Sequence, residues 1–179
     1  ASLFIVNQLL TLSRWKEKDD AWTTRVLEQI TRSLPRNYVN GVLVKALMGH
    51  PDQTGTLYRR LYEAGSRHIA QSTAIRPTPL PDWTRAVPHS KRYKEVWEML
   101  GPFLTSPTEQ VFEYRKAQQY RSEVESAISN ATIDLRTETI TRGSPHTLRI
   151  IKTQAEYERA LKIWEEDVAL LAEMERIRP

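Results

Sequence analysis

The residue types that most often act in catalysis are scattered along this 179-residue chain. The four histidines fall in separate segments, with no H-E-x-x-H pattern and no carboxylate at the spacing of metal ligands. Three of them stand in expected turns and the fourth on an expected helix, where surface or half-buried histidines are ordinary. We therefore expect no metal site and no histidine-based catalysis from His50, His68, His89 and His146.

Other chemistries lack either their residues or their spacing. The chain has no cysteine, which excludes thiol nucleophiles, disulfides and cysteine-ligated metals. Its six glycines form neither a G-x-x-x-x-G-K-[ST] nor a G-x-G-x-x-G loop. The consecutive acids Glu165, Glu166 and Asp167 point in different directions on a helix, which predicts a solvated face. We expect a non-catalytic protein with no cofactor and no small-molecule substrate; a helical enzyme without a known motif is the alternative.

One stretch of the chain concentrates positive charge and aromatic rings. Between Tyr58 and Lys94 eight basic residues stand against two acids, whereas the whole chain carries a net charge of only +4. Tyr58, Tyr62, Trp83 and Tyr93 are interleaved with these cations. Cations that pair with phosphates and rings that stack on unpaired bases are typical of contacts with single-stranded or ribosomal RNA. The candidate residues for binding RNA or an acidic partner are Arg59, Arg60, Arg67, Arg76, Arg85, Lys91, Arg92 and Lys94.

Two other interpretations of this basic stretch stay open. The same surface could bind another protein, or it could be a basic surface whose tyrosines serve the core and which has no specific partner. The salt dependence of nucleic-acid binding separates RNA contact from these two interpretations, because each phosphate contact adds to the slope of log K against log salt.

The C-terminal segment has the opposite charge and a narrow apolar seam. From Gln154 onward seven acids stand against four bases. Apolar residues recur every three or four positions, which predicts a long helix docked along a groove or against a partner helix. We expect this helix to be an interaction element and not the centre of the core. The candidate protein-interaction residues are Trp83, Tyr157, Leu161, Trp164, Val168 and Leu171.

The segment Leu57-Tyr58-Arg59-Arg60-Leu61-Tyr62 resembles the motif that opens the first helix of the LYR-motif family. Members of that family are small helical mitochondrial proteins, accessory subunits or assembly factors of respiratory complexes, that engage acyl carrier protein through basic residues. The resemblance implies a helical protein-binding accessory factor. It also implies that Arg59 and Arg60 contact an acidic partner.

A mainly helical fold must position these segments. Apolar residues at helical spacing predict helices over about 21–34, 35–49, 56–71, 91–101, 107–130 and 154–177. Gly65, inside the third of these, predicts a close crossing with another backbone, since glycine is otherwise costly in a helix. β-branched residues on both sides of a Gly-Ser-Pro turn predict a small β-hairpin over about 131–153.

These elements define five successive regions. The fold class we expect is mainly α, an irregular multi-helix bundle with a small β-hairpin and a long C-terminal helix. The regions are an N-terminal helical region (1–71), a proline-rich strap (72–90), a helical pair (91–130), the β-hairpin (131–153) and a C-terminal interaction helix (154–179). Together we expect them to form one folded unit, because a chain of this length buries a sizeable core.

The class that fits these features is a structural or accessory subunit of a large assembly. A ribonucleoprotein such as a mitochondrial ribosome is the expected setting, with the strap contacting RNA and protein; the alternative is a LYR-like protein-binding factor of a mitochondrial complex, without RNA contact. No apolar run approaches the ~20 residues of a membrane span, and the first bases follow the first apolar stretch, the wrong order for a secretory signal. The first sixteen residues contain no acid, as in organellar presequences, but an ordinary amphipathic first helix is the favoured interpretation of this segment. We expect a soluble intracellular protein, and the compartment that we expect is the mitochondrial matrix.

Overall fold

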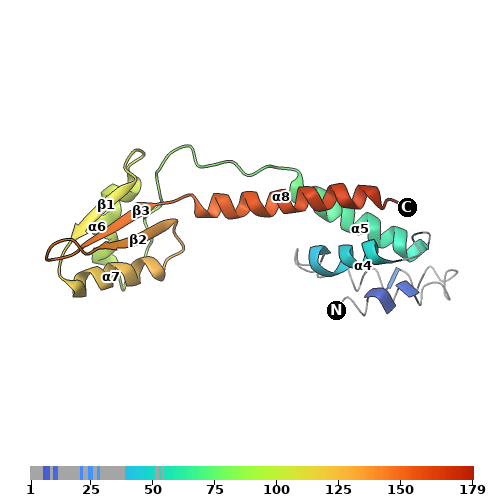
Figure 1. Cartoon of the computed structure of the whole chain (residues 1–179), viewed down its shortest axis with the longest axis horizontal. Helices are drawn as coiled ribbons and strands as arrows, with labels where there is room; N and C mark the ends of the chain where they lie inside the picture. Colours follow the sequence, from blue (N-terminus) through green and yellow to red (C-terminus); the bar gives the residue numbers. More distant parts are fainter. Residues whose placement is uncertain are drawn as a thin grey trace. The chain divides into compact units, whose positions relative to one another are not determined.

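The computed structural model describes residues 6–8, 10, 11, 21, 24, 25, 28, 39–50, 53 and 55–179. They form two compact units: unit 1 is Ala1–Pro77 with Leu161–Pro179, and unit 2 is Thr78–Ala160. The fold is mainly α-helical, with a small antiparallel sheet and a long C-terminal helix (Figure 1). This confirms the predicted fold class at that level. The helix predicted over 21–34 lies almost entirely outside the described residues, and the formation of one folded unit stays a prediction.

Unit 1 is built from helices that share one apolar core. A π-helical turn, η1 (Val39–Leu43), leads into α4 (Val44–Gly49), within the range predicted for one helix. Helix α5 (Thr56–Thr73) runs two residues past its predicted end, and α8 (Ala155–Arg176) contributes its residues from Leu161 onward to this unit. The largest fully buried side chains of this core include Leu43, Leu47, Leu57, Tyr58, Leu61, Ile69 and Met174.

Gly65 lies in α5 where this helix packs beneath α8. The atoms nearest to a methyl group built on Gly65 would be Met174 Cε, at 3.5 Å, and Leu43 Cδ2, at 3.6 Å. Both are the ends of side chains. The predicted approach of another backbone is therefore wrong, because a flexible methionine and a leucine fill the space above the glycine.

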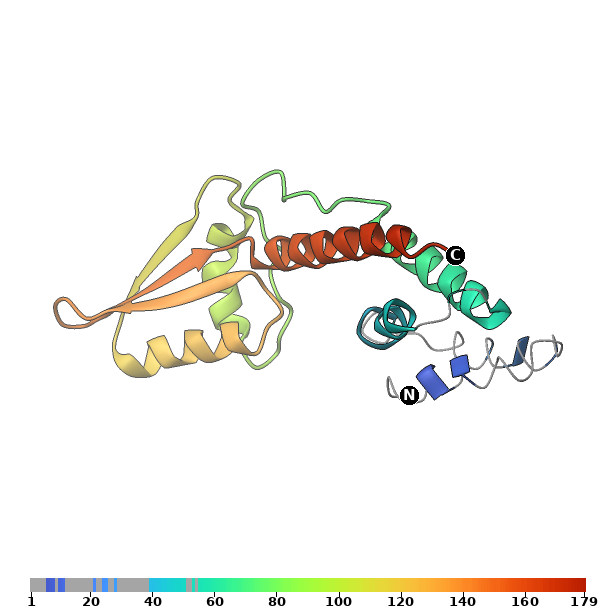
Figure 2. The same cartoon turned by 45° about the vertical axis from the view of Figure 1, so that its right-hand side comes forward.

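Unit 2 is a three-stranded antiparallel sheet that packs against two helices (Figure 2). Its elements are α6 (Lys94–Thr105), β1 (Val111–Arg115), α7 (Gln118–Ser129), β2 (Leu135–Ile140) and β3 (Thr147–Lys152). The strand order is β1-β3-β2. Leu148 and Ile150 of the central strand are buried in a core with α6 and α7. Because side chains alternate along a strand, Arg149 faces the other way, where it pairs with Glu113 at 3.1 Å and Glu138 at 3.8 Å.

Two predictions about unit 2 are wrong. The predicted hairpin over 131–153 is present as β2 and β3, but a third strand, β1, pairs with β3 in a segment predicted to begin a helix. Phe112 and Tyr114 are two residues apart and pack on the core, which is the period of a strand. Helix α6 continues through Pro102 to Thr105. The carbonyl that loses its partner at Pro102 belongs to the exposed Glu98, where water can replace the missing bond.

No helix within the described ranges is long and apolar enough to cross a membrane.

Candidate nucleic-acid interface

The part of the proline-rich strap that belongs to unit 2, residues 78–90, is fixed to this unit at Trp83 and Arg85. The backbone N–H of Trp83 donates to the carbonyl of Pro107 at 3.1 Å, and that of Arg85 donates to the carbonyl of Leu104 at 2.7 Å. These two bonds tie the strap to the last turn of α6 and to the segment that follows this helix. The strap therefore has a defined path alongside the C-terminal end of that helix.

Arg85, one of the predicted binding cations, is buried and acts as an anchor. Its guanidinium donates to the carbonyls of Thr153, at 2.7 Å, and Thr84, at 2.9 Å. The same group lies 5.6 Å from the centre of the Trp83 ring. These contacts occupy Arg85 inside unit 2, so the structure does not present it to a phosphate.

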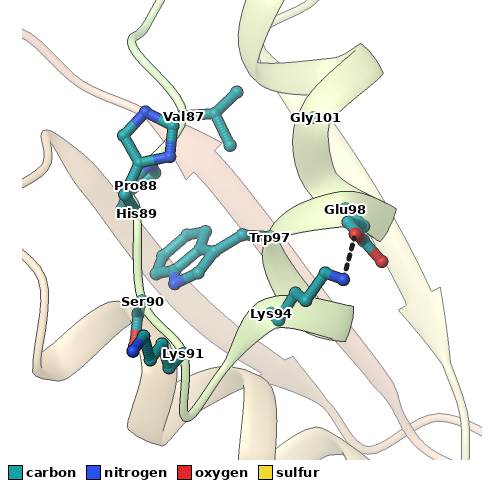
Figure 3. A pocket seen from close by; sticks show the side chains of 9 residues that line it. All are labelled: Val87, Pro88, His89, Ser90, Lys91, Lys94, Trp97, Glu98 and Gly101. Atoms are coloured by element: carbon teal, nitrogen blue, oxygen red, sulfur yellow. Dashed lines mark ion pairs between the residues drawn. The ribbon is translucent and has the colours of Figure 1, made fainter.

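Beyond this anchor the strap passes over a hollow of about 640 Å³ (Figure 3). The wall of the hollow is apolar and is made by Val87, Pro88, Trp97 and Gly101. The rest of its lining is polar: His89, Ser90, Lys91, Lys94 and Glu98. An apolar hollow of this size with a few convergent polar groups is typical of a ligand site. We call it the basic hollow.

Trp97 forms the floor of the basic hollow and carries an unsatisfied donor. The residue is 3% exposed, and its indole nitrogen has no hydrogen-bond partner. Figure 3 shows this nitrogen on the edge of the ring toward Ser90. A buried donor without an acceptor costs about 1–3 kcal/mol, so an acceptor that reached this edge would recover part of that free energy.

A second hollow of about 420 Å³ shares Pro88, His89, Ser90 and Trp97 with the first. Its other lining residues include Arg92 and Tyr93, with the Arg92 guanidinium 5.0 Å from the centre of the Tyr93 ring. Residues 88–90 of the strap thus border both hollows. The first hollow is also lined by Lys91 and Lys94, and the second is also lined by Arg92.

The cations at the two hollows are exposed and weakly engaged. Lys94 Nζ lies 3.6 Å from a carboxylate oxygen of Glu98, one helical turn away, with both side chains largely in solvent. Exposed pairs of this kind are worth about 0.3–0.5 kcal/mol. Lys91, Arg92 and Lys94 therefore supply positive charge that an anionic partner can use. Glu98 is the one acid among the described residues that line the two hollows, and Glu123 lines a further hollow beside Arg92.

The other predicted cations lie in unit 1. On α5, Arg59 and Arg67 are exposed, with Glu63 one turn from each, and Arg60 donates to Thr24 Oγ1 at 3.2 Å. The Arg76 guanidinium lies 5.5 Å from the centre of the Trp164 ring. Of the eight predicted cations, the structure brings only Lys91, Arg92 and Lys94 together around the hollows.

The predicted interaction seam of α8 is partly used within unit 1. Trp164 is half-buried, and its indole N–H donates to the carbonyl of Thr73 at 3.0 Å. Leu171 packs against the core of this unit, whereas Val168 is 37% exposed. The remaining residues predicted for protein interaction, Tyr157, Leu161 and Trp83, are half-buried. A partner-binding role for these residues stays a prediction.

The prediction of a solvated face at Glu165-Glu166-Asp167 is wrong for Asp167. This residue is buried, and its carboxylate accepts a hydrogen bond from Ser72 Oγ at 3.0 Å. The third acid of the run turns toward α5, because a step of two residues on a helix moves a side chain to another face.

Three residues that line the hollows were not predicted as site residues from the sequence: His89, Ser90 and Trp97. A signal was present, since Lys94, Trp97, Glu98 and Gly101 follow the i, i+3, i+4, i+7 spacing of one helix face. All four line the basic hollow. No pattern in the sequence indicates that the Trp97 indole nitrogen lacks a hydrogen-bond partner.

The fold and the site define a mainly α-helical protein whose small α/β unit carries a basic hollow. Comparison of the chain with protein-family models, curated proteins and solved structures finds no match. The resemblance to the LYR-motif family thus stays confined to the six residues at the start of α5. There Leu57, Tyr58, Leu61 and Tyr62 are buried and Arg59 is exposed, the pattern of any amphipathic helix.

Proposed function

We propose that this chain is a non-catalytic accessory subunit of a ribonucleoprotein, such as a mitochondrial ribosome, and contacts single-stranded RNA through the hollows of unit 2. The observation that carries the proposal is the position of Lys91, Arg92 and Lys94 around two hollows that share Trp97. Cations beside aromatic and apolar surfaces are the combination used to hold unpaired nucleotides. The subunit acts in the mitochondrial matrix, and its other surfaces contact protein.

The proposal assigns different roles to the predicted cations. Lys91, Arg92 and Lys94 pair with phosphates, whereas Arg85 holds the strap in place. An extended RNA strand carries one charge per nucleotide, so cations on both sides of strap residues 88–90 suit consecutive phosphates better than one compact anion.

The salt dependence of RNA binding tests this proposal. The triple variant Lys91→Gln, Arg92→Gln, Lys94→Gln is compared with the native chain by fluorescence anisotropy on a labelled single-stranded RNA. Because each phosphate contact contributes about 0.7 to the slope of log K against log salt for a single strand, the slope should fall by about 2.

A control variant removes the same charge elsewhere in unit 2. Lys116→Gln, Arg136→Gln, Arg142→Gln changes three exposed cations outside the lining of either hollow. It should keep the native slope. Equal slopes for both triple variants, or no RNA binding by the native chain, would refute the proposal.

A protein-binding factor without RNA contact is the second candidate function. The exposed Arg59 and Arg67 on α5 favour it, because an acidic partner could reach both. The double variant Arg59→Gln, Arg67→Gln should weaken binding of an acidic protein such as acyl carrier protein under this alternative. Under the RNA proposal it should leave the RNA-binding slope of unit 2 unchanged.

A further inference from the structure

We infer that the basic hollow is a subsite for one unpaired nucleobase, with its phosphate between Lys91 and Lys94 and a base acceptor atom bonded to the Trp97 indole N–H. This inference rests on the proposed RNA contact and specifies how one nucleotide is held. Its volume of about 640 Å³ falls within the range of about 300–1,000 Å³ for ligand sites.

The two sides of the hollow match the two halves of a nucleotide. The apolar wall of Val87, Pro88 and Trp97 suits the faces of a planar base. Figure 3 shows Lys91 below the Trp97 ring and Lys94 beside it, turned toward Glu98, and the inference places the phosphate between these two lysines. An acidic peptide would match the lysines but offers no flat ring for the wall.

The strap controls access to the indole nitrogen. That nitrogen is buried on the side of the ring toward Ser90, so a base reaches it only when the strap shifts. Within the described part of the chain, residues 86–90 make no hydrogen bond, and the nearest backbone tie is at Arg85. Moving these residues therefore breaks no hydrogen bond, and the base would give Trp97 the acceptor it lacks.

Nuclear magnetic resonance of the tryptophan indole groups tests this contact directly. The chain has five tryptophans, and the indole signal lost in Trp97→Phe identifies Trp97. Adding an oligouridine should shift this signal downfield, because its N–H gains an acceptor. An abasic oligomer with the same number of phosphates should leave the signal in place.

Binding measurements give a second readout. The native chain should bind the oligouridine at least about fivefold more tightly than the abasic oligomer, as expected when one base packs against aromatic surface. Trp97→Phe keeps an aromatic ring but removes the donor, and should weaken oligouridine binding by about five- to tenfold. Tyr120→Phe, which removes a donor from an exposed ring of α7 outside the lining of both hollows, is the matched control and should bind like the native chain.

Three outcomes decide between the two levels of the proposal. If the abasic oligomer binds as tightly as the oligouridine and the Trp97 signal does not move, the base subsite is wrong, while a flattened salt slope in the lysine-arginine variant still supports RNA contact. If neither oligomer binds, both proposals fail. If a polyglutamate peptide shifts the Trp97 signal and competes with the oligouridine, the hollow is a site for acidic protein segments and the inference is overturned.

Discussion

Replacing Gly65 by alanine should stabilise unit 1. Alanine is favoured over glycine inside a helix by about 1 kcal/mol, and Gly65 lies in the middle of α5. The added methyl would sit 3.5 Å from Met174 Cε and 3.6 Å from Leu43 Cδ2, which is ordinary van der Waals contact. We therefore expect Gly65→Ala to raise the free energy of unfolding by about 1 kcal/mol.

A larger side chain at the same position should have the opposite effect. The γ-carbons of valine extend about 1.5 Å beyond Cβ, into space that Met174 and Leu43 already occupy. Overpacking of this kind costs typically about 1–3 kcal/mol. Gly65→Val should thus destabilise unit 1, and the change of sign between the two variants measures how much room lies between α5 and α8.

Urea unfolding followed by far-UV circular dichroism, with hydrogen exchange of the α5 amides, measures both effects. Gly101→Ala in α6 is the control for helix propensity alone, because a methyl built there meets no atom within 4 Å in the described structure. If Gly65→Ala destabilises the protein while Gly101→Ala stabilises it, the packing described above Gly65 is wrong.

Two further predictions concern buried polar groups. Burial, and then the charge of Arg85, lower the pKa of Lys152 from its ordinary 10.5. The unfolded chain therefore binds this proton more readily, and the free energy of unfolding rises as the pH increases toward 10.5. Lys152→Met should flatten this rise in urea unfolding at pH 7 to 10.5, and identical pH profiles for the variant and the native chain would contradict the prediction. Trp164→Phe should lower the free energy of unfolding by about 1 kcal/mol, because its N–H bond to Thr73 is lost. Thermal unfolding beside Trp83→Phe checks this, and an unchanged stability would show that the bond contributes nothing.

The sequence predicted helices where one apolar face repeats over several turns. The predicted ends of α5 and α8 lie within a few residues of the observed ends. Apolar residues keep helical spacing in both helices: Leu57, Leu61 and Ile69 in α5, and Leu171 and Met174 in α8. The five residues of β1 were missed. A short strand whose inward residues are tyrosine and phenylalanine, directly before a real helix, has too few periods to be separated from that helix.

The candidate site was predicted only in part, because charge alone does not tell an anchor from a binding residue. Arg85 and Lys91 are both cations three residues from Pro88 in the sequence, yet Arg85 is buried among carbonyl groups and Lys91 borders a hollow. That difference depends on contacts with Thr153, distant in the chain. The apolar spacing of the helix around Trp97 is consistent with its burial, but no pattern in the sequence indicates that its indole nitrogen lacks a partner.

The anchor needs residues that are held firmly, whereas the hollow needs residues that can move, and different parts of the strap meet these two requirements. A buried guanidinium is costly unless its donors are bonded. Arg85 donates to the carbonyls of Asp82, Thr84 and Thr153 and lies over Trp83, which fixes the strap at that point, and its Nε alone has no partner among the described residues. Residues 86–90 carry no hydrogen bonds in the described structure, and Val87 alone among them packs against the apolar core. A strap held firmly at Arg85 and free of hydrogen bonds above Trp97 can yield to a ligand without unfolding the unit beneath it. This separation is what the proposed RNA contact requires, because binding then shifts five residues and leaves the sheet and its two helices in place.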